Sequence, residues 1–239
     1  RAGKQHGGYS KNEKPVYAKL PSDHGSHLGR RIVYFTDETR ESQMLQIEAL
    51  SCFRQDRHLF KDLNAKVLPG QALQIVGENG SGKTTLFKIL AGLFEEYEGR
   101  VITSDAAQVL YLGHRYGVND QLTPIENLKF LLQLNENQLA PDALEAALFR
   151  FQLRAELDEP CASLSEGQKK RVALARLILT SARIWLLDEA FSALDAPGRA
   201  VLSEVCQAHM ASGGILIFSS HQAIPEFASA AQLRLEAGS

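Results

Sequence analysis

The sequence predicts an α/β protein with a parallel β-sheet at its core, an antiparallel β subdomain and an inserted helical subdomain. Three observations support this prediction. An apolar strand pattern, a glycine-rich loop and a helical pattern follow one another within residues 71–86. Helical and strand patterns alternate from residue 166 onward, as in β-α-β units. Between residues 124 and 157, apolar side chains recur at helical spacing, so we place the helical subdomain at about 124–180.

The individual elements follow from apolar periodicity and from turn signals such as Pro69-Gly70. The first strands form an antiparallel edge that leads into the strand before the glycine-rich loop. The expected strands are 45–50, 63–67, 72–76, 100–103, 109–112, 184–187, 215–219 and 231–235, and the expected helices are 83–92, 166–180 and 199–209.

Residues 1–43 differ from the rest of the chain. They are rich in Gly, Ser, His, Lys and Arg, show no periodicity, and begin at Arg1. Met44 stands directly before the first clear strand. We therefore expect 1–43 to be a non-native or disordered leader and 44–239 to be the folded domain.

Composition excludes several classes of function. A formal net charge of −2 lacks the basic character of a nucleic-acid-binding domain. Cys52, Cys161 and Cys206 are too widely spaced for a zinc or haem-attachment motif, so we expect buried, reduced thiols. No apolar run approaches the roughly 18 to 20 residues that span a bilayer. A function at a membrane would therefore need another chain to hold the protein there.

The glycine-rich loop has the pattern Gly-x-x-x-x-Gly-Lys-Thr between a strand and a helix. Its glycines allow backbone N–H groups to turn inward around phosphates, and the helix that follows adds its N-terminal dipole. Lys83 would then neutralise phosphate oxygens, and Thr84 would bind a bridging Mg²⁺. The loop predicts binding of ATP with Mg²⁺ through Gly77, Glu78, Asn79, Gly80, Ser81, Gly82, Lys83, Thr84 and Thr85.

A second candidate site lies at the end of the apolar strand 184–187, which is followed by Asp188 and Glu189. Ligands of open α/β sheets bind at the carboxyl edge of the strands. We therefore predict Asp188 as a Mg²⁺ partner opposite Thr84. Glu189 is the candidate that orients and polarises the attacking water, because phosphoryl transfer depends mainly on positioning.

Leu164-Ser165-Glu166-Gly167-Gln168 resembles the LSGGQ signature of ATP-binding cassette (ABC) proteins, and it precedes Asp188 by the spacing of that family. The resemblance implies a P-loop NTPase with the ABC cassette fold, in which Ser165, Gly167 and Gln168 close on ATP held by a second copy. Ser165 is also a good helix N-cap. Glu166 replaces the commonest glycine, and we expect its side chain to point away from the nucleotide.

Two later segments extend the resemblance. Ser192-Ala193-Leu194-Asp195 is similar to the D-loop, with Ala190 at a position where proline is common. His221 follows a strand and is similar to the switch histidine that senses the γ-phosphate. The resemblance thus implies three catalytic residues, which are Lys83, Glu189 and His221.

Other loops point to one branch of the family. His114 replaces the usual Q-loop glutamine, and Phe53-Arg54 offers either a ring or a guanidinium to stack on adenine. With the segments 171–177 and 220–222, these loops resemble the CcmA family, the ATP-binding subunit of the haem exporter of cytochrome c maturation. That resemblance implies a homodimer, a CcmB-like membrane subunit, CcmC-like and haem-chaperone CcmE-like proteins, and a peripheral location on the cytoplasmic face of the bacterial inner membrane.

Three other functions stay open. The chain could be an ABC ATPase for another solute, because the membrane subunit determines the substrate. It could also be a non-transport ABC protein acting on ribosomes or DNA, although such proteins usually carry two cassettes or long coiled-coil arms. A regulator with little hydrolysis is disfavoured by Lys83, Asp188, Glu189 and His221.

Overall fold

The described strands form two separate β-sheets. The computed structural model describes residues 32–35, 45–54, 56–104, 108–114, 116–133, 140–155 and 157–236. One sheet has five strands in the order β6-β7-β8-β4-β9, and every pairing in it is parallel. Its strands are β6 (Val109–Leu112), β7 (Ile184–Leu187), β8 (Ile215–Ser219), β4 (Ala72–Gly77) and β9 (Ala231–Leu235). This is the parallel core that the sequence predicts.

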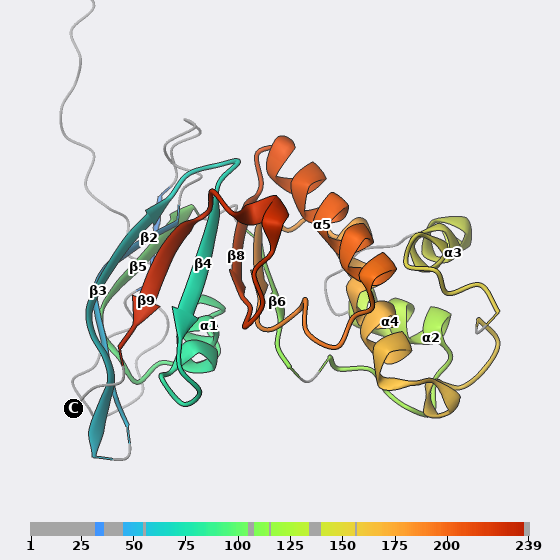
Figure 1. Cartoon of the computed structure of the whole chain (residues 1–239), viewed down its shortest axis with the longest axis horizontal. Coiled ribbons are helices and arrows are strands. Elements are labelled where there is room, and N and C mark those ends of the chain that lie inside the picture. Colours follow the sequence, from blue (N-terminus) through green and yellow to red (C-terminus); the bar gives the residue numbers. More distant parts are fainter. Residues whose placement is uncertain are drawn as a thin grey trace, which may run out of the picture.

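The second sheet has four strands in the order β1-β5-β2-β3 and lies beside the first (Figure 1). Its strands are β1 (Ile32–Phe35), β5 (Glu98–Ser104), β2 (Leu45–Arg54) and β3 (Arg57–Val67). β2 pairs antiparallel with both β3 and β5. The expected antiparallel edge is therefore a separate sheet, because none of these strands pairs with β4, the strand before the glycine-rich loop.

The hairpin β2–β3 is longer than the sequence predicts. Polar residues interrupt the apolar pattern of both strands, and register shifts occur between Ile47 and Phe53. Ala49 and Asp62 adopt positive φ angles of 46° and 51° at these irregularities. Such bulges break the period of two on which the prediction relied.

Part of the segment expected to be a leader belongs to this sheet. β1 pairs parallel with β5, from Ile32 opposite Val101 to Phe35 opposite Ser104. The other residues of the segment 1–43 lie outside the described residues, as does Met44. The boundary at residue 44 therefore leaves out one strand of the fold.

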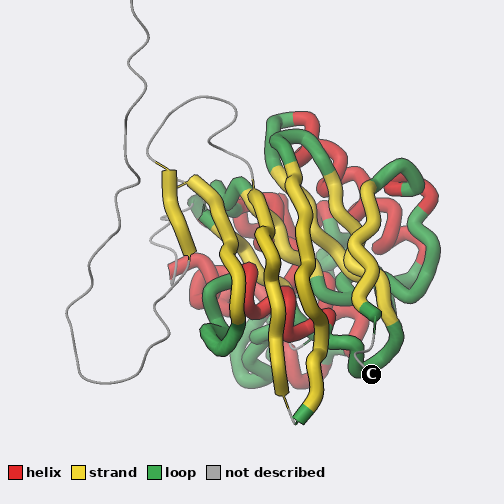
Figure 2. The backbone as a smooth tube through the Cα atoms, turned by 90° about the vertical axis from the view of Figure 1, so that its left-hand side faces the viewer, coloured by secondary structure: helices red, strands yellow, loops and turns green. Residues whose placement is uncertain are grey.

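The helices lie on two sides of the parallel sheet (Figure 1). Figure 2 looks onto the strand-rich side and shows helices behind the strands. α2, α3 and α4 contact one another and form the predicted helical subdomain, within which the region 124–157 holds two helices. α5 begins three residues earlier than expected, because Asp195 caps it through the backbone N–H of Gly198. The helices are α1 (Lys83–Leu90), α2 (Pro124–Gln133), α3 (Pro141–Arg150), α4 (Glu166–Leu179) and α5 (Ala196–Ala211), with short 3-10 turns at Cys161–Ser163 and Pro225–Phe227.

Two buried apolar clusters hold these layers together. One joins both sheets around α1, whose Leu86, Phe87 and Ile89 are fully buried. The other joins the helical subdomain, α5 and the far face of the parallel sheet. α1, which follows the glycine-rich loop directly, is thus fixed from both sides.

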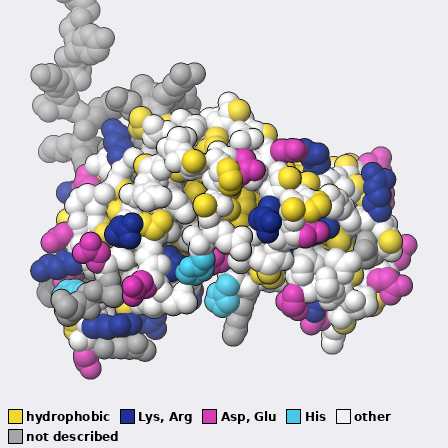
Figure 3. All heavy atoms as spheres, in the orientation of Figure 1, with side chains coloured by type: hydrophobic (Ala, Val, Ile, Leu, Met, Phe, Trp, Pro, Cys, Tyr) yellow, Lys and Arg dark blue, Asp and Glu magenta, His cyan; other side chains and the backbone are white. Residues whose placement is uncertain are grey.

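The distribution of charged side chains on the surface agrees with the small net charge of the sequence. On the face shown in Figure 3, basic and acidic side chains are interspersed and no area of a single sign dominates. All three cysteines are free and buried, as predicted. No helix in the described part of the chain is long and apolar enough to cross a membrane.

Candidate functional site

The glycine-rich loop joins β4 to α1 in a conformation that only glycine adopts easily. Gly80 and Gly82 have φ angles of +81° and +98°, in the left-handed region. A Cβ atom on Gly77 would lie 2.5 Å from the hydroxyl oxygen of Ser81 and 2.8 Å from the carbonyl oxygen of Leu235. The loop therefore folds as the sequence predicts, with its backbone in close contact with itself and with β9.

The side chain of Lys83 lies back along this loop. Its Nζ donates hydrogen bonds to the carbonyl oxygens of Gly77 (2.7 Å) and Glu78 (2.9 Å). The ammonium group is therefore held over the loop by two backbone acceptors. A phosphate oxygen within reach could take one of its three N–H donors.

Thr84 and Asp188 meet at the carboxyl edge of the parallel sheet, as predicted. The hydroxyl of Thr84 donates to Oδ2 of Asp188 over 2.7 Å. Ser219, at the end of β8, donates from its hydroxyl to Oδ1 of the same carboxylate (2.9 Å). Asp188 is only 3% exposed, and each of its two carboxylate oxygens accepts a hydrogen bond from a buried or half-buried hydroxyl. A hydroxyl beside a carboxylate is an oxygen donor set that suits Mg²⁺.

Glu189 occupies a strained position directly after this carboxylate. Its φ is +57°, which costs a non-glycine residue on the order of 1 to 3 kcal/mol. Both carboxylate oxygens are buried and accept no hydrogen bond from the described residues. Nε2 of His221 lies 3.5 Å from Oε1, too far for a good hydrogen bond but close enough for an ion pair when the ring is protonated. The carboxylate of Glu189 is thus directed into the site without a close partner.

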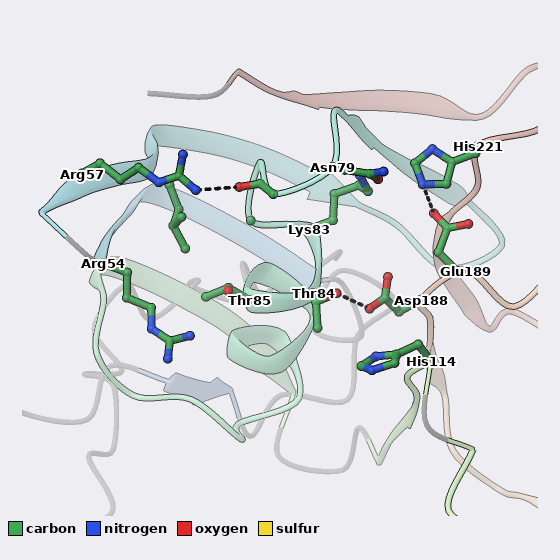
Figure 4. A pocket seen from close by; sticks show the side chains of 13 residues that line it. Arg54, Arg57, Asn79, Lys83, Thr84, Thr85, His114, Asp188, Glu189 and His221 are labelled. Atoms are coloured by element: carbon green, nitrogen blue, oxygen red, sulfur yellow. Dashed lines mark hydrogen bonds and ion pairs between the residues drawn. The ribbon is translucent and has the colours of Figure 1, made fainter. Parts of the chain in front are cut away.

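These groups line one cavity of about 390 Å³ (Figure 4). It gathers most of the residues predicted to bind nucleotide, together with Leu59 and Arg57, from elements far apart in the sequence. Gly77, Glu78 and Ser81 belong to the loop but do not line the cavity. The predicted residues that do line it are Arg54, Asn79, Gly80, Gly82, Lys83, Thr84, Thr85, His114, Asp188, Glu189 and His221.

The hairpin β2–β3 contributes two arginines rather than an aromatic ring. Arg54 lines the cavity, and its guanidinium carbon also lies 5.4 Å from the centroid of the Phe94 ring. Arg57 lines the cavity too and donates from Nη2 to the carbonyl oxygen of Gly80 over 3.4 Å. Phe53 is 56% exposed, packs edge-on against His58, and is not among the residues that line the cavity. Sequence reasoning missed Arg57, because only the folded hairpin brings it beside the glycine-rich loop.

The signature residues lie away from this cavity in the same chain. The hydroxyl of Ser165 caps α4 by accepting from the backbone N–H of Gln168, and the backbone N–H of Ser165 donates to Oε1 of Gln168. This is the capping box that the sequence allows. Ser165, Gly167 and Gln168 line a separate pocket of about 420 Å³ with the D-loop residues Ala193 to Asp195. The side chain of Glu166 is 81% exposed.

Burial shifts the pKa of three groups around the site. It lowers the pKa of Lys170 to about 8, against the opposing field of Glu189, and lowers the pKa of Arg176 to about 10. Burial, with the nearby charge of Asp188, raises the pKa of Tyr111 to about 12. Tyr111 is therefore neutral at physiological pH, so it adds no charge beside Asp188.

Comparison with known proteins decides the family. The family model for ABC transporters matches residues 60–192, more than half of the chain. The chain belongs to the ABC transporter family. It is an ABC ATPase, and within that family it is a CcmA-like ATP-binding protein.

Its curated relatives are close and share most of their length with it. The cytochrome c biogenesis ATP-binding export protein CcmA of Saccharophagus degradans is 44% identical over 194 residues, which cover 74% of this chain and 87% of that protein. CcmA of Aromatoleum aromaticum is 42% identical over 197 residues, 78% of this chain and 92% of that protein.

Solved structures support the ABC fold. An ABC transporter ATP-binding protein from Pyrococcus furiosus superposes with a TM-score of 0.71 at 23% identity, covering 81% of this chain and 98% of that one. The ATP-binding subunit of another ABC transporter gives a TM-score of 0.70. The predicted fold class is therefore confirmed.

Proposed function

We propose that this ABC ATPase binds Mg-ATP in the 390 Å³ cavity, hydrolyses it within a homodimer, and drives the haem-export machinery of cytochrome c maturation. The observation that carries the ATPase part is the convergence of the glycine-rich loop, the two strand-end carboxylates and His221 on one cavity. The names of the CcmA relatives carry the cytochrome c part.

In this proposal, the loop and Lys83 hold the phosphates. The backbone N–H groups around Gly80 and Gly82 and the start of α1 supply partial positive charge. Lys83 exchanges one of its two carbonyl acceptors for a phosphate oxygen. The base lies toward the β2–β3 hairpin, where Arg54 and Arg57 present planar cations that can stack on adenine or contact phosphate.

Thr84 and Asp188 would hold Mg²⁺. Their side-chain oxygens already lie 2.7 Å apart, and Ser219 fixes the orientation of the carboxylate. When bound, the ion neutralises charge on the phosphate oxygens of the substrate. The residues present therefore fit the metal that the family uses.

Glu189 would orient the attacking water and accept its proton. Its oxygens are buried and lack hydrogen bonds from the described residues, so a water molecule would meet a carboxylate with free acceptor capacity. His221, 56% exposed and 3.5 Å from Oε1, would contact the γ-phosphate, and His114 would take the place of the Q-loop glutamine.

Each complete site would need two copies of the chain. The pocket at Ser165 is separate from the cavity of the same chain, and the positive end of the α4 helix dipole suits an anion. In a homodimer, Ser165 and Gly167 of one copy would close over the nucleotide held by the other. The side chain of Glu166, 81% exposed in the single chain, would point away from that nucleotide, because a carboxylate beside the phosphate would be repulsive.

The partner would be a CcmB-like integral membrane subunit, with CcmC-like and haem-chaperone proteins in the same assembly. The chain would then act peripherally at the cytoplasmic face of the bacterial inner membrane, where ATP hydrolysis releases the haem-loaded chaperone. The alternative is an ABC ATPase that serves the transport of a different solute. No observation favours that alternative over haem export.

Replacing the chain in its native host by a Lys83→Ala variant tests this function. We expect the tagged protein to co-purify with a membrane subunit from solubilised membranes. We also expect haem to accumulate on the chaperone, and holocytochrome c to be lost from haem-stained gels. Normal holocytochrome c with the Lys83→Ala variant would rule out the haem-export function.

A further inference from the structure

Lys170 is a buried lysine that the proposed chemistry does not use. It lies in α4, five residues after Ser165, and is only 1% exposed. A buried ammonium group is costly unless its donors are satisfied. Lys170 therefore needs partners, and its ammonium group donates three hydrogen bonds to one turn of the chain.

That turn is the segment from Glu189 to Ser192. The Nζ of Lys170 donates to the carbonyl oxygen of Glu189 (2.8 Å), to the carbonyl oxygen of Ser192 (2.5 Å) and to the hydroxyl of Ser192 (3.2 Å). Its three N–H donors thus have three acceptors. The ring of Tyr116 adds a cation–π contact at 5.1 Å.

The carbonyl of Glu189 is held by several donors at once. Besides Lys170, it accepts from the hydroxyl (2.6 Å) and the backbone N–H (3.2 Å) of Ser192. On its other side, the backbone N–H of Glu189 donates to the hydroxyl of Ser219 (2.9 Å). A left-handed φ at a glutamate persists only when the surroundings determine it in this way.

The direction of the Glu189 side chain therefore depends on its backbone. Among the described residues, the carboxylate oxygens accept no hydrogen bond, and their one ion-pair contact is His221 at 3.5 Å. If the turn relaxed to an ordinary φ, nothing on the side chain would keep the carboxylate in the cavity. Small misplacements of a catalytic group cost large factors in rate.

The neighbours of Lys170 on the helix do something different. Lys169 forms an ion pair with Asp120 (2.7 Å), and Arg171 forms one with Asp195. Lys170 alone among these three reaches the backbone of Glu189. Lys169 is thus a matched control, with the same side chain one position earlier.

We propose that Lys170 is a positioning residue for ATP hydrolysis, which holds the turn 189–192 so that the carboxylate of Glu189 stays aimed into the nucleotide cavity. It also ties that turn to the helix whose N-terminus carries Ser165. The inference rests on the proposed catalytic role of Glu189. It adds that the buried Lys170 keeps the Glu189 carboxylate in its orientation.

The test compares steady-state ATPase kinetics of Lys170→Met, Lys170→Gln and Lys169→Met with the wild type. For Lys170→Met we expect kcat to fall about 30-fold while KM for ATP stays within about 2-fold, because only the reacting geometry changes. Lys170→Gln keeps hydrogen-bond donors and should recover part of that loss. Lys169→Met should keep a near-normal kcat.

A double variant separates positioning from a general structural role. In the Glu189→Gln background, adding Lys170→Met should change the residual rate by less than about 2-fold, because the lysine acts through Glu189. Independent, multiplicative losses in the double variant would overturn the proposal, as would unchanged kcat in Lys170→Met or a loss confined to KM. If Lys170→Met is too unstable to purify, Lys170→Gln decides by the same criteria.

The proposed function fails separately. Near-normal turnover by Glu189→Gln would remove the catalytic role of Glu189, and the inference with it. A stalled Glu189→Gln protein together with a normal Lys170→Met protein would overturn the positioning role alone.

Discussion

Thr84 and Asp188 are 104 positions apart in the sequence, and the hydroxyl of Thr84 donates to Oδ2 of Asp188 over 2.7 Å. β4 and β7 are separated in the parallel sheet by β8 alone, so their carboxyl ends bring the two residues to the same edge. Ser219, at the end of the intervening β8, completes the row by donating to the same carboxylate. The sheet order itself thus builds the candidate metal site.

Thr84→Val removes this hydroxyl and keeps the branched shape of the side chain. We expect Mg²⁺-dependent ATP hydrolysis to fall about 100-fold, because the ion loses one oxygen ligand and Asp188 loses a donor. A Mg²⁺ titration of ATPase activity measures the effect. Thr84→Ser keeps the hydroxyl and serves as the control. Equal activity of the valine and serine variants would remove Thr84 from the metal site.

Arg57 gives a second prediction, because it lines the cavity and the sequence did not suggest it. Arg57→Ala should weaken ATP binding about 5-fold, close to the 1 kcal/mol of a partly exposed stacking or phosphate contact. Titration with a fluorescent ATP analogue measures it. Lys61→Ala, an exposed basic residue on the same strand, should bind as the wild type does. A larger loss of ATP affinity in Phe53→Ala than in Arg57→Ala would indicate instead that adenine stacks on the ring of Phe53.

His221→Ala tests the residue opposite Glu189. The variant should keep ATP affinity and lose about 100-fold in turnover, because a group that contacts the transferring phosphate acts mainly in the transition state. Single-turnover hydrolysis with excess protein separates the chemical step from product release. A loss seen only in ATP affinity would make His221 a binding residue.

The proposed sharing of each site between two copies predicts the behaviour of mixed dimers. A Lys83→Ala subunit lacks its own phosphate lysine, and a Ser165→Arg subunit cannot close over its neighbour's nucleotide. A mixed dimer of the two should therefore retain one competent site at most. Wild-type ATPase rates from tagged, purified mixed dimers would contradict a site shared between copies.

His209 predicts a pH dependence of stability. Its ring stacks on Trp185 with centroids 3.7 Å apart, and burial lowers the pKa of the imidazole to about 4. In the unfolded chain the pKa of this imidazole is near 6.5. Between about pH 6.5 and pH 4 the unfolded chain therefore binds a proton at His209 that the folded chain does not bind. Stability is therefore full above about pH 6.5 and falls as the pH drops toward 4. Urea unfolding at several pH values should show a smaller fall for His209→Phe, and an unchanged fall would exclude His209 as the cause.

The local motifs of the site could be predicted, because each lies within a few consecutive residues. The glycine loop, the strand end at Asp188 and the capped helix at Ser165 all have sequence signals that depend on neighbours alone. Contacts between distant segments could not be predicted in this way. In the sequence, Lys170 is one of three consecutive basic residues, and only the fold places it beneath Glu189. Ser219 and Arg57 depend in the same way on sheet order and on hairpin length.

The fold shows the same division. The parallel core was predictable because its inner strands β7 and β8 are short, fully buried and separated by the helix α5. The long hairpin β2–β3 and the pairing of β1 with β5 were not, because bulges, polar faces and a distant partner determine them.

The most direct test of this account is the turnover of Glu189→Gln. The variant keeps the size of the side chain and removes the carboxylate that is aimed, without a close partner, into the cavity. We predict normal ATP binding, accumulation of an ATP-bound dimer in size-exclusion chromatography, and phosphate release slower by about 100-fold or more. Phosphate release close to the wild-type rate would contradict the account.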